Sequence, residues 1–493
     1  MVRRATFRLM VFFAVWVLPG VAASVSADAL WDESEKLRSH YAAELDELAE
    51  WCAAEGLAEQ ARLTRRAQGA RDPYKLHLPV LPRQAGPPKL PESSSPAAAQ
   101  WHGRFYGLRR EHAAALFGLA RRAVRRRASL AYMLALESLH ANPDNESVRR
   151  LFGYQKYRGR WQTFYEVRQL RSGKVWHEKF GWLPAAHVRR YEQGQRYHRG
   201  RWISAAEDAR EHREIRSGWN VQTEHYTILT NHSIEAGVQL GQKLERLYRL
   251  WSQIFIRYYA SEAHVVGLFD GRGRTAKIEP PKFSVVFFRN RDDYNRTLRR
   301  AVPNIGISVG FYSEGTATAY FFAGEDYADR TLYHEATHQL FHQSRPVAAD
   351  VGRKANFWIV EGIAMYMESL RRQDDDYVLG GFEDQRMHAA RVRLLRDGFY
   401  VPLEELTAYG MEKVHQDPRI ATLYSQAAGL ANFLVYYDGG RYRDALVAYL
   451  SAVYDGRDTP DSLAELTGTT YAELDRQYRA FIKSSIAGAK DDQ

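Results

Sequence analysis

The segment from Tyr333 to Leu340 constrains the fold of this chain more than any other feature. It contains His334 and His338, with Glu335 directly after the first histidine, in the pattern HExxH. Residues four apart lie one turn apart on the same face of an α-helix, so a helix here brings two imidazoles to one metal ion. Glu335 then projects beside that metal, where its carboxylate can take a proton from a metal-bound water. The spacing therefore predicts a helix that presents a metal site.

The cysteine count restricts the ligands that can complete such a site. The chain has 493 residues and one cysteine, Cys52. A single cysteine excludes an internal disulfide framework, a CxxC redox pair and a zinc site built on thiolates, so a third ligand should be His, Asp or Glu. Glu361 fits, because it opens an apolar segment of helical spacing 23 residues after His338, which leaves room for a loop and a second, antiparallel helix. Gly362 and Ala364 are small enough to let the two helices approach.

The patterns around these helices indicate an α+β fold for residues 219–485. Strands are predicted at 225–230, 283–288 and 316–322, and helices at 237–259 and 292–300. From residue 323 to about 485, nearly every segment has helical spacing.

With both motifs in view, the chain resembles a known group of enzymes. HExxH followed by W-x-x-E-G-x-A-x-Y-x-E at Trp358–Glu368 is similar to the gluzincin metallopeptidases, especially the peptidase-MA-like group. Within that group it resembles an uncharacterised family of secreted bacterial proteins that also carry a Gly-Trp repeat region. The resemblance covers about residues 219–485 and implies a zincin-like domain, in which a small mixed sheet precedes a helical subdomain. It implies zinc held by His334, His338 and Glu361, with Glu335 as general base and acid.

The resemblance also implies two supporting groups. Gluzincins commonly stabilise the oxyanion with a Tyr or His from a later helix, and Tyr424 best matches that helix. A tyrosine of the hydrophobic core is the alternative interpretation of Tyr424, and His388 is a weaker candidate for the same role. Glu368 lies two turns after Glu361 on the same face and is the candidate to orient a ligating imidazole.

A strand before the HExxH helix has a further expected role. In zincin-like folds an edge strand at this place pairs with extended substrate through main-chain hydrogen bonds. We expect strand 316–322 to be that edge, with Gly310, Phe311 and Tyr312 forming the approach to it. An ordinary strand within the sheet is the alternative interpretation.

Residues 1–27 have the composition of a secretory signal peptide. Three arginines precede an apolar run at 9–18, and small residues at 25–27 offer a cleavage site. The run is short for a membrane span, and no other stretch is long and apolar enough for one. An uncleaved anchor is the alternative. We expect an exported protein, periplasmic or extracellular, and the absence of disulfides favours a bacterial one.

Residues 28–152 have helical spacing that is interrupted by a linker. Seven prolines and three consecutive serines within 73–100 predict an extended loop. Arginines are dense at 109–127, and the chain has a formal net charge of +10. We interpret the arginines as a solvated helix face, because no nucleic-acid-binding motif accompanies them. No nucleic-acid partner is therefore expected.

Residues 153–217 contain an internal repeat. The segment GYQKYRGRW at 153–161 returns as GQRYHRGRW at 194–202, and Gly181-Trp182 gives a third Gly-Trp pair between them. Glycine closely followed by tryptophan is typical of a short strand that leaves a turn. We favour small β units braced by buried tryptophans. The alternative is a module that binds a cell-envelope polymer through exposed aromatic rings.

These observations divide the chain into five segments. They are a signal peptide at 1–27, a helical region at 28–152, a Gly-Trp repeat module at 153–217, a gluzincin-like domain at 218–486 and a tail at 487–493. The predicted function is zinc-dependent hydrolysis of peptide bonds in a peptide or protein substrate. The alternative is a catalytically inactive or non-peptidase cell-envelope binding or scaffold protein with a vestigial or structural metal site.

Overall fold

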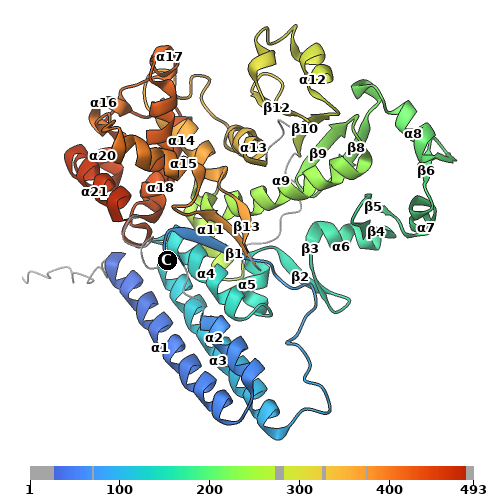
Figure 1. Ribbon diagram of the computed structural model, residues 1–493, viewed down its shortest axis with the longest axis vertical. Helices are drawn as coiled ribbons and strands as arrows, with labels where there is room; N and C mark the ends of the chain where they lie inside the picture. The colour runs from blue at the N-terminus through green and yellow to red at the C-terminus, as the bar shows by residue number, and fades with distance from the viewer. Residues whose placement is uncertain (1–26, 69–71, 273–281, 325–328, 374–375, 485–493) are drawn as a thin grey trace, which may run out of the picture.

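The computed structural model describes residues 27–68, 72–272, 282–324, 329–373 and 376–484, which form a mixed α+β structure (Figure 1). Residues 1–26 of the predicted signal segment and the predicted tail at 487–493 lie outside these ranges. Among the helices that the structure describes, none has both the length and the apolar character needed to cross a membrane.

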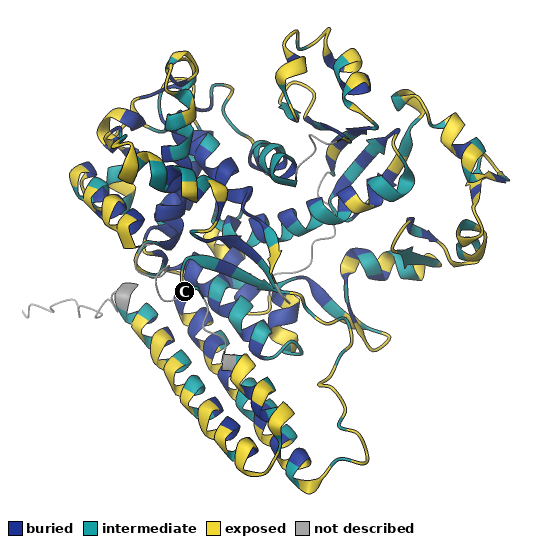
Figure 2. Ribbon diagram, viewed as in Figure 1, coloured by how far each residue is buried: buried dark blue, intermediate teal, exposed yellow. Residues whose placement is uncertain are grey.

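The first helices form an arm that projects from the rest of the molecule (Figure 1). They are α1 (Ala27–Ala54), α2 (Ala58–Gln68) and α3 (Pro96–Ala123). Leu48, Cys52 and Trp101 belong to the small buried cluster that holds them together. Exposed residues cover the outer faces of the arm (Figure 2). Arg110, Arg121, Arg122, Arg125 and Arg126 are exposed, in agreement with the interpretation of these arginines as solvated surface, but Arg127 is buried.

The second helical pair joins the arm to the body. It consists of α4 (Ala128–Ala141) and α5 (Glu146–Leu151), which share a buried cluster with α11 (Glu262–Phe269). The Ser129 hydroxyl at the start of α4 also donates a hydrogen bond of 2.8 Å to the Asp444 carboxylate of the C-terminal part. One buried core therefore crosses the predicted boundary at residue 152.

The Pro-rich segment between α2 and α3 is partly a strand. It contains β1 (Lys75–Pro79), which pairs antiparallel with β14 (Asp376–Gly380), and β14 pairs with β13 (Arg371–Gln373). The expectation of nearly unbroken helix after residue 322 was wrong for these two strands. They are short, and their sheet is completed by a segment from the N-terminal region, so local spacing does not reveal the pairing.

Residues 153–217 form three β-hairpins, each followed by a short helical segment, and the units run in an arc beside the sheet (Figure 1). The hairpins are β2 (Tyr154–Tyr157) with β3 (Arg160–Thr163), β4 (Lys174–His177) with β5 (Gly181–Pro184), and β6 (Gln195–His198) with β7 (Arg201–Ser204). The helical segments are α6 (Phe164–Arg171), η1 (Ala185–His187) with α7 (Val188–Glu192), and α8 (Ala205–Glu211).

The two copies of the sequence repeat, at 153–161 and 194–202, lie in the first and third units, so one further unit lies between them. In the first and third units an Arg-Gly pair forms the turn, with Arg158 at φ 51° and Gly159 at 74°, and Arg199 at 46° and Gly200 at 86°. Two consecutive positive φ angles define the two-residue turn that suits the twist of a hairpin. The side chain of Trp161 is fully buried, whereas Trp182 and Trp202 are partly exposed. The prediction of bracing by buried tryptophan is therefore confirmed for the first unit.

A five-stranded sheet with the order β11-β12-β10-β9-β8 forms one side of the body. Its strands are β8 (Trp219–Gln222), β9 (Tyr226–Thr230), β10 (Phe283–Phe288), β11 (Phe311–Ser313) and β12 (Thr318–Phe322). β9, β10 and β12 are parallel, and α9 (Ile234–Ile254) packs against the β8–β9 side. β12 lies between β10 and β11, so the expectation that it is the edge strand was wrong. The chain folds back at 313–318, and β11 occupies the edge instead.

Helices make up the other half of the body. α13 (Asp329–Gln343) packs on the sheet on one side and on α14 (Phe357–Met367) on the other (Figure 1). The helices that follow α14 form a layer that packs against it. In this half of the body, α14 and α18 are largely buried (Figure 2). The members of the layer are α15 (Gln385–Arg391), α16 (Leu403–Thr407), α17 (Met411–Gln416), α18 (Ile420–Gly440), α19 (Arg443–Tyr454), α20 (Ser462–Thr467) and α21 (Tyr471–Ser484).

Gly362 permits a close helix contact, but with a partner that the sequence did not indicate. A Cβ atom at this position would lie 2.8 Å from the backbone oxygen of Ala427 on α18. Gly362, the residue directly after Glu361, therefore lets α14 approach α18. The sequence had suggested that it would let α14 approach the HExxH helix.

Replacing Gly362 with alanine is expected to destabilise the protein by about 1–3 kcal/mol, because a rigid backbone atom occupies the space of the added methyl group. The matched control is Gly267→Ala on α11, where an added Cβ meets nothing within 4 Å. The control should be neutral or stabilising by up to about 1 kcal/mol, because alanine favours the helix. Thermal unfolding of both variants measures the difference, and equal stability would contradict the contact.

Candidate metal centre

The side chains of His334, His338 and Glu361 meet where α13 packs on α14. His334 Nε2 lies 3.5 Å from one carboxylate oxygen of Glu361, and His338 Nε2 lies 3.7 Å from the other. The two Nε2 atoms are 3.2 Å apart. Ligand atoms at zinc distances of about 2.0–2.1 Å in a tetrahedron lie about 3.3 Å from one another. The three residues are thus close enough to hold one metal ion.

The imidazole of His334 is fixed by a carboxylate on its other side. Its Nδ1 lies 2.9 Å from Glu368 Oε1, and because a carboxylate accepts, Nδ1 donates. Arg386 holds that carboxylate with two hydrogen bonds of 2.9 Å, one to each oxygen. Such a paired contact is both strong and directional. Glu368 therefore sets the ring orientation that turns Nε2 of His334 toward Glu361.

The charges of the site shift the pKa of its members. Burial by itself lowers the pKa of His334, but hydrogen bonds to Glu361 and Glu368 raise it to about 10. Burial by itself raises the pKa of Glu361, but the hydrogen bond from His334 and the charge of His338 lower it to about 2. Burial lowers the pKa of His338. The imidazole of His334 and the two carboxylates thus favour each other's charged forms, so metal binding at His334 would release a proton.

Glu335 lies at the free edge of the sheet. Its Oε2 accepts a hydrogen bond of 3.0 Å from the backbone N–H of Tyr312 in β11. A Cβ at Gly310 would come within 3.2 Å of Glu335 Cγ, so the glycine makes room for this side chain. Tyr312 pairs with Ala319 of β12 on its other side. The carboxylate predicted to be the general base therefore contacts the strand that forms the edge.

Tyr424 and His388, the two candidates for oxyanion stabilisation, have different surroundings. Tyr424 lies on α18, is partly buried, and packs against the main hydrophobic core. Burial raises the pKa of its phenol, and the negative charge of Glu361 raises it further, so the phenol stays protonated near that carboxylate. His388 lies on α15 with an exposed side chain. The charge of Glu361 thus reaches Tyr424, whereas His388 is exposed to solvent.

Two arginines at this site were not singled out from the sequence. Besides Arg386, the Nε of Arg330 lies 3.4 Å from Glu368, and its Nη1 lies 2.9 Å from Asp384. Arg330 precedes His334 by four residues, so helical spacing alone could have placed it on the same face. Arg386 had no such signal, because its approach depends on how α15 packs.

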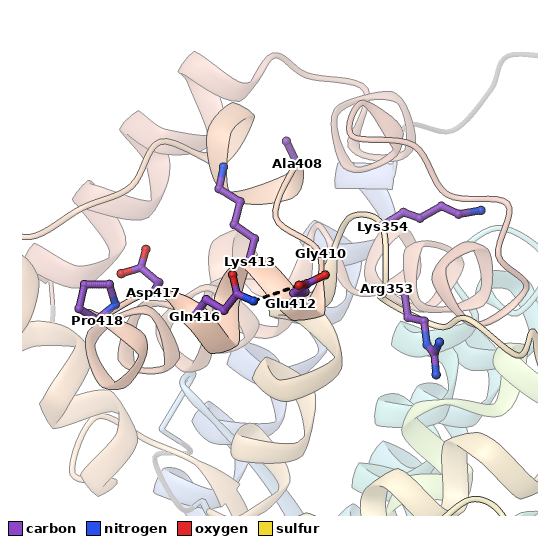
Figure 3. A pocket seen from close by; sticks show the side chains of 9 residues that line it. All are labelled: Arg353, Lys354, Ala408, Gly410, Glu412, Lys413, Gln416, Asp417 and Pro418. Carbon is purple, nitrogen blue, oxygen red and sulfur yellow. Dashed lines mark hydrogen bonds between the residues drawn. The ribbon is translucent and has the colours of Figure 1, made fainter.

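Two hollows lie away from these residues. An open pocket of about 500 Å³ near α16 and α17 is lined by Arg353, Lys354 and Lys413, with the Gln416–Glu412 hydrogen bond beside them (Figure 3). A cavity of about 1100 Å³ lies between the arm, β1 and α9. Neither lining includes the three ligand candidates, so we assign the predicted chemistry to neither hollow.

Comparison of the chain with known protein families found no family that matches it, and comparison with curated proteins found no match. The arrangement of the side chains is therefore the basis on which a function is proposed.

Proposed function

We propose that this protein is an exported, zinc-dependent metallopeptidase of gluzincin type. The observation that carries the proposal is that the Nε2 atoms of His334 and His338 lie 3.2 Å apart and 3.5 and 3.7 Å from the two carboxylate oxygens of Glu361, close to the spacing of about 3.3 Å between the ligand atoms of a zinc ion. Two imidazoles and one carboxylate are a donor set typical of catalytic zinc in peptidases. The export part of the proposal rests on the composition of residues 1–27 and implies a periplasmic or extracellular site of action.

The residues around this site have separate tasks in peptide-bond hydrolysis. Bound zinc would lower the pKa of a water molecule and polarise the substrate carbonyl. Glu335 would accept a proton from the attacking water as its oxygen bonds to the carbonyl carbon, and would deliver that proton to the amine nitrogen as the C–N bond breaks. Tyr424 donates its phenolic proton in a hydrogen bond to the oxyanion of the tetrahedral intermediate. Glu368 and Arg386 keep His334 in the orientation that binds the metal.

The free edge of β11 gives an extended substrate a place to bind. An extended peptide adds to an open strand through main-chain hydrogen bonds. The Tyr312 N–H of β11 already donates to Glu335, so a peptide on this edge would pair with the remaining outward backbone groups of β11 and run past the general base. This assigns to β11 the role that we first expected for β12.

Digestion of a peptide library by the purified, zinc-loaded protein tests the proposed function. Cleavage should stop when a chelator removes the metal, and it should return when zinc is added back, because the water is activated by the metal. Cleavage that continues at the same rate in the metal-free protein would refute the proposal.

Replacing Tyr424 with phenylalanine is expected to lower kcat by about 10²–10³-fold with little change in KM, because the hydrogen bond is made to the oxyanion and not to the ground-state carbonyl. Tyr197→Phe, at an exposed tyrosine of the third hairpin, is the control for loss of a hydroxyl group. If both variants keep the wild-type kcat, Tyr424 is a core residue and another group stabilises the oxyanion.

A further inference from the structure

The third hairpin unit contains a second group of metal-binding side chains. His198 ends β6, Asp208 lies on α8, and His212 follows that helix. Their ligand atoms all lie within 4.8 Å of one another. His198 Nδ1 is 4.0 Å from Asp208 Oδ1, and His212 Nδ1 is 3.3 Å from the same oxygen.

The other two units provide an internal comparison for these positions. The residue that precedes the helical segment is Thr163 in the first unit, Pro184 in the second and Ser204 in the third. Four residues later the three units have Val167, Val188 and Asp208. Eight residues later they have Arg171, Glu192 and His212. The last residue of the first strand is Tyr157, His177 and His198. The third unit alone has a carboxylate where the others have valine, and alone has histidine at both neighbouring positions.

The carboxylate of Asp208 is buried, which is costly for a charged group. Its side chain is 7% exposed, and the valine at the same position in the first unit is also buried. A buried carboxylate destabilises the fold unless hydrogen bonds or a cation compensate it. Trp219 Nε1 donates a hydrogen bond of 2.8 Å to Oδ2, which leaves Oδ1 directed at the two imidazoles.

The surroundings of the two histidines suit metal ligands. His212 Nδ1 lies 2.7 Å from the backbone oxygen of Asp208 as well as 3.3 Å from its Oδ1, so this nitrogen faces the carboxylate, and a bound cation would take the place of its proton. The His212 ring also stacks on Trp219, with centroids 4.6 Å apart, so it is held in place. The side chains of His198 and His212 are 15% and 14% exposed, which leaves a path for an ion from solvent.

We propose that His198, Asp208 and His212 form a second metal site that binds a divalent transition-metal cation, with zinc as the reference ion. Two imidazoles and a carboxylate favour such cations over calcium or magnesium, which prefer oxygen ligands. The ion neutralises the buried carboxylate and joins β6 to α8. Because Trp219 of β8 holds the same carboxylate, the ion also tightens the attachment of the repeat module to the five-stranded sheet. This site is independent of the proposed function at α13.

The test is the zinc content of the full-length protein after equilibration with excess zinc and removal of unbound metal. The main variant is Asp208→Val, which introduces the side chain that the other two units carry and is therefore expected to fold. It should bind one zinc equivalent less than the wild type, whatever the α13 site holds. His198→Tyr and His212→Arg, which copy the first unit, should show the same loss.

A variant of the α13 site separates the two proposals. His338→Ala should keep the equivalent bound by the hairpin site, and His338→Ala combined with Asp208→Val should keep none. Equal zinc content in the wild type and in folded Asp208→Val, with folding checked by circular dichroism, would overturn the second site and leave Asp208 as a hydrogen-bonded structural carboxylate. Failure of the wild type to cleave peptides would refute only the proposed function.

Discussion

Replacing Glu335 with glutamine is expected to lower the rate of peptide cleavage by about 10²–10⁴-fold while zinc stays bound. Glutamine has nearly the same shape, but its amide cannot accept the proton of the attacking water. It can still accept the hydrogen bond from the Tyr312 backbone through its oxygen, so the position of the side chain should be retained. The loss should therefore fall on kcat rather than on folding or metal content.

Steady-state kinetics and metal analysis of the same preparation measure this result. The control is Glu404→Gln on α16, the same chemical change at an exposed position, which should leave both quantities unchanged. Cleavage by Glu335→Gln at the wild-type rate, with zinc bound, would remove Glu335 from the mechanism. Loss of zinc together with activity would instead mean that the carboxylate supports the metal.

Replacing His338 with alanine is expected to abolish both zinc binding at α13 and cleavage. Removal of a residue that only orients a ligand typically costs about 10–100-fold in metal affinity, and removal of a ligand should cost more. The free energy of unfolding of the variant should fall by less than the free energy of zinc binding, because His334 keeps its ion pairs with Glu361 and Glu368 when no metal is bound.

Competition with a chelating dye gives the zinc affinity of this variant, and His388→Ala is the matched control. His388 is an exposed histidine on α15, so its loss should change neither affinity nor rate. Wild-type zinc affinity at the α13 site of His338→Ala, with the hairpin site removed by Asp208→Val, would contradict the ligand assignment.

The amino-acid pattern predicted the local parts of this site well. His334, Glu335 and His338 lie on one helix, as a spacing of four requires, and Glu361 lies on the next helix within reach of both imidazoles. Strand β10 has the predicted bounds, and β9 and β12 differ from the predicted segments by one or two residues at the N-terminal end. These features follow from periodicity within a short stretch, which local sequence specifies.

Other features depend on contacts between distant segments. β1 and β14 form a sheet across most of the length of the chain, and β11 displaces β12 from the edge of its sheet. Arg386 reaches Glu368 because α15 packs on α18, the helix that also packs on α14. The close neighbour of Gly362 is α18, although the sequence suggested the HExxH helix. Neither the partner nor the register of such contacts is encoded in the spacing of one segment.

The sequence by itself determined which residue types are available for chemistry: two histidines and a glutamate at helical spacing, a second glutamate downstream, and a single cysteine that excludes thiolate sites. The tertiary structure decided the distances between their atoms, the strand that Glu335 contacts, and the meeting of His198, Asp208 and His212 in the third hairpin unit. The physical reason is that helical and strand periodicity act over a few residues, whereas the position of a ligand or a buried carboxylate depends on the packing of whole elements.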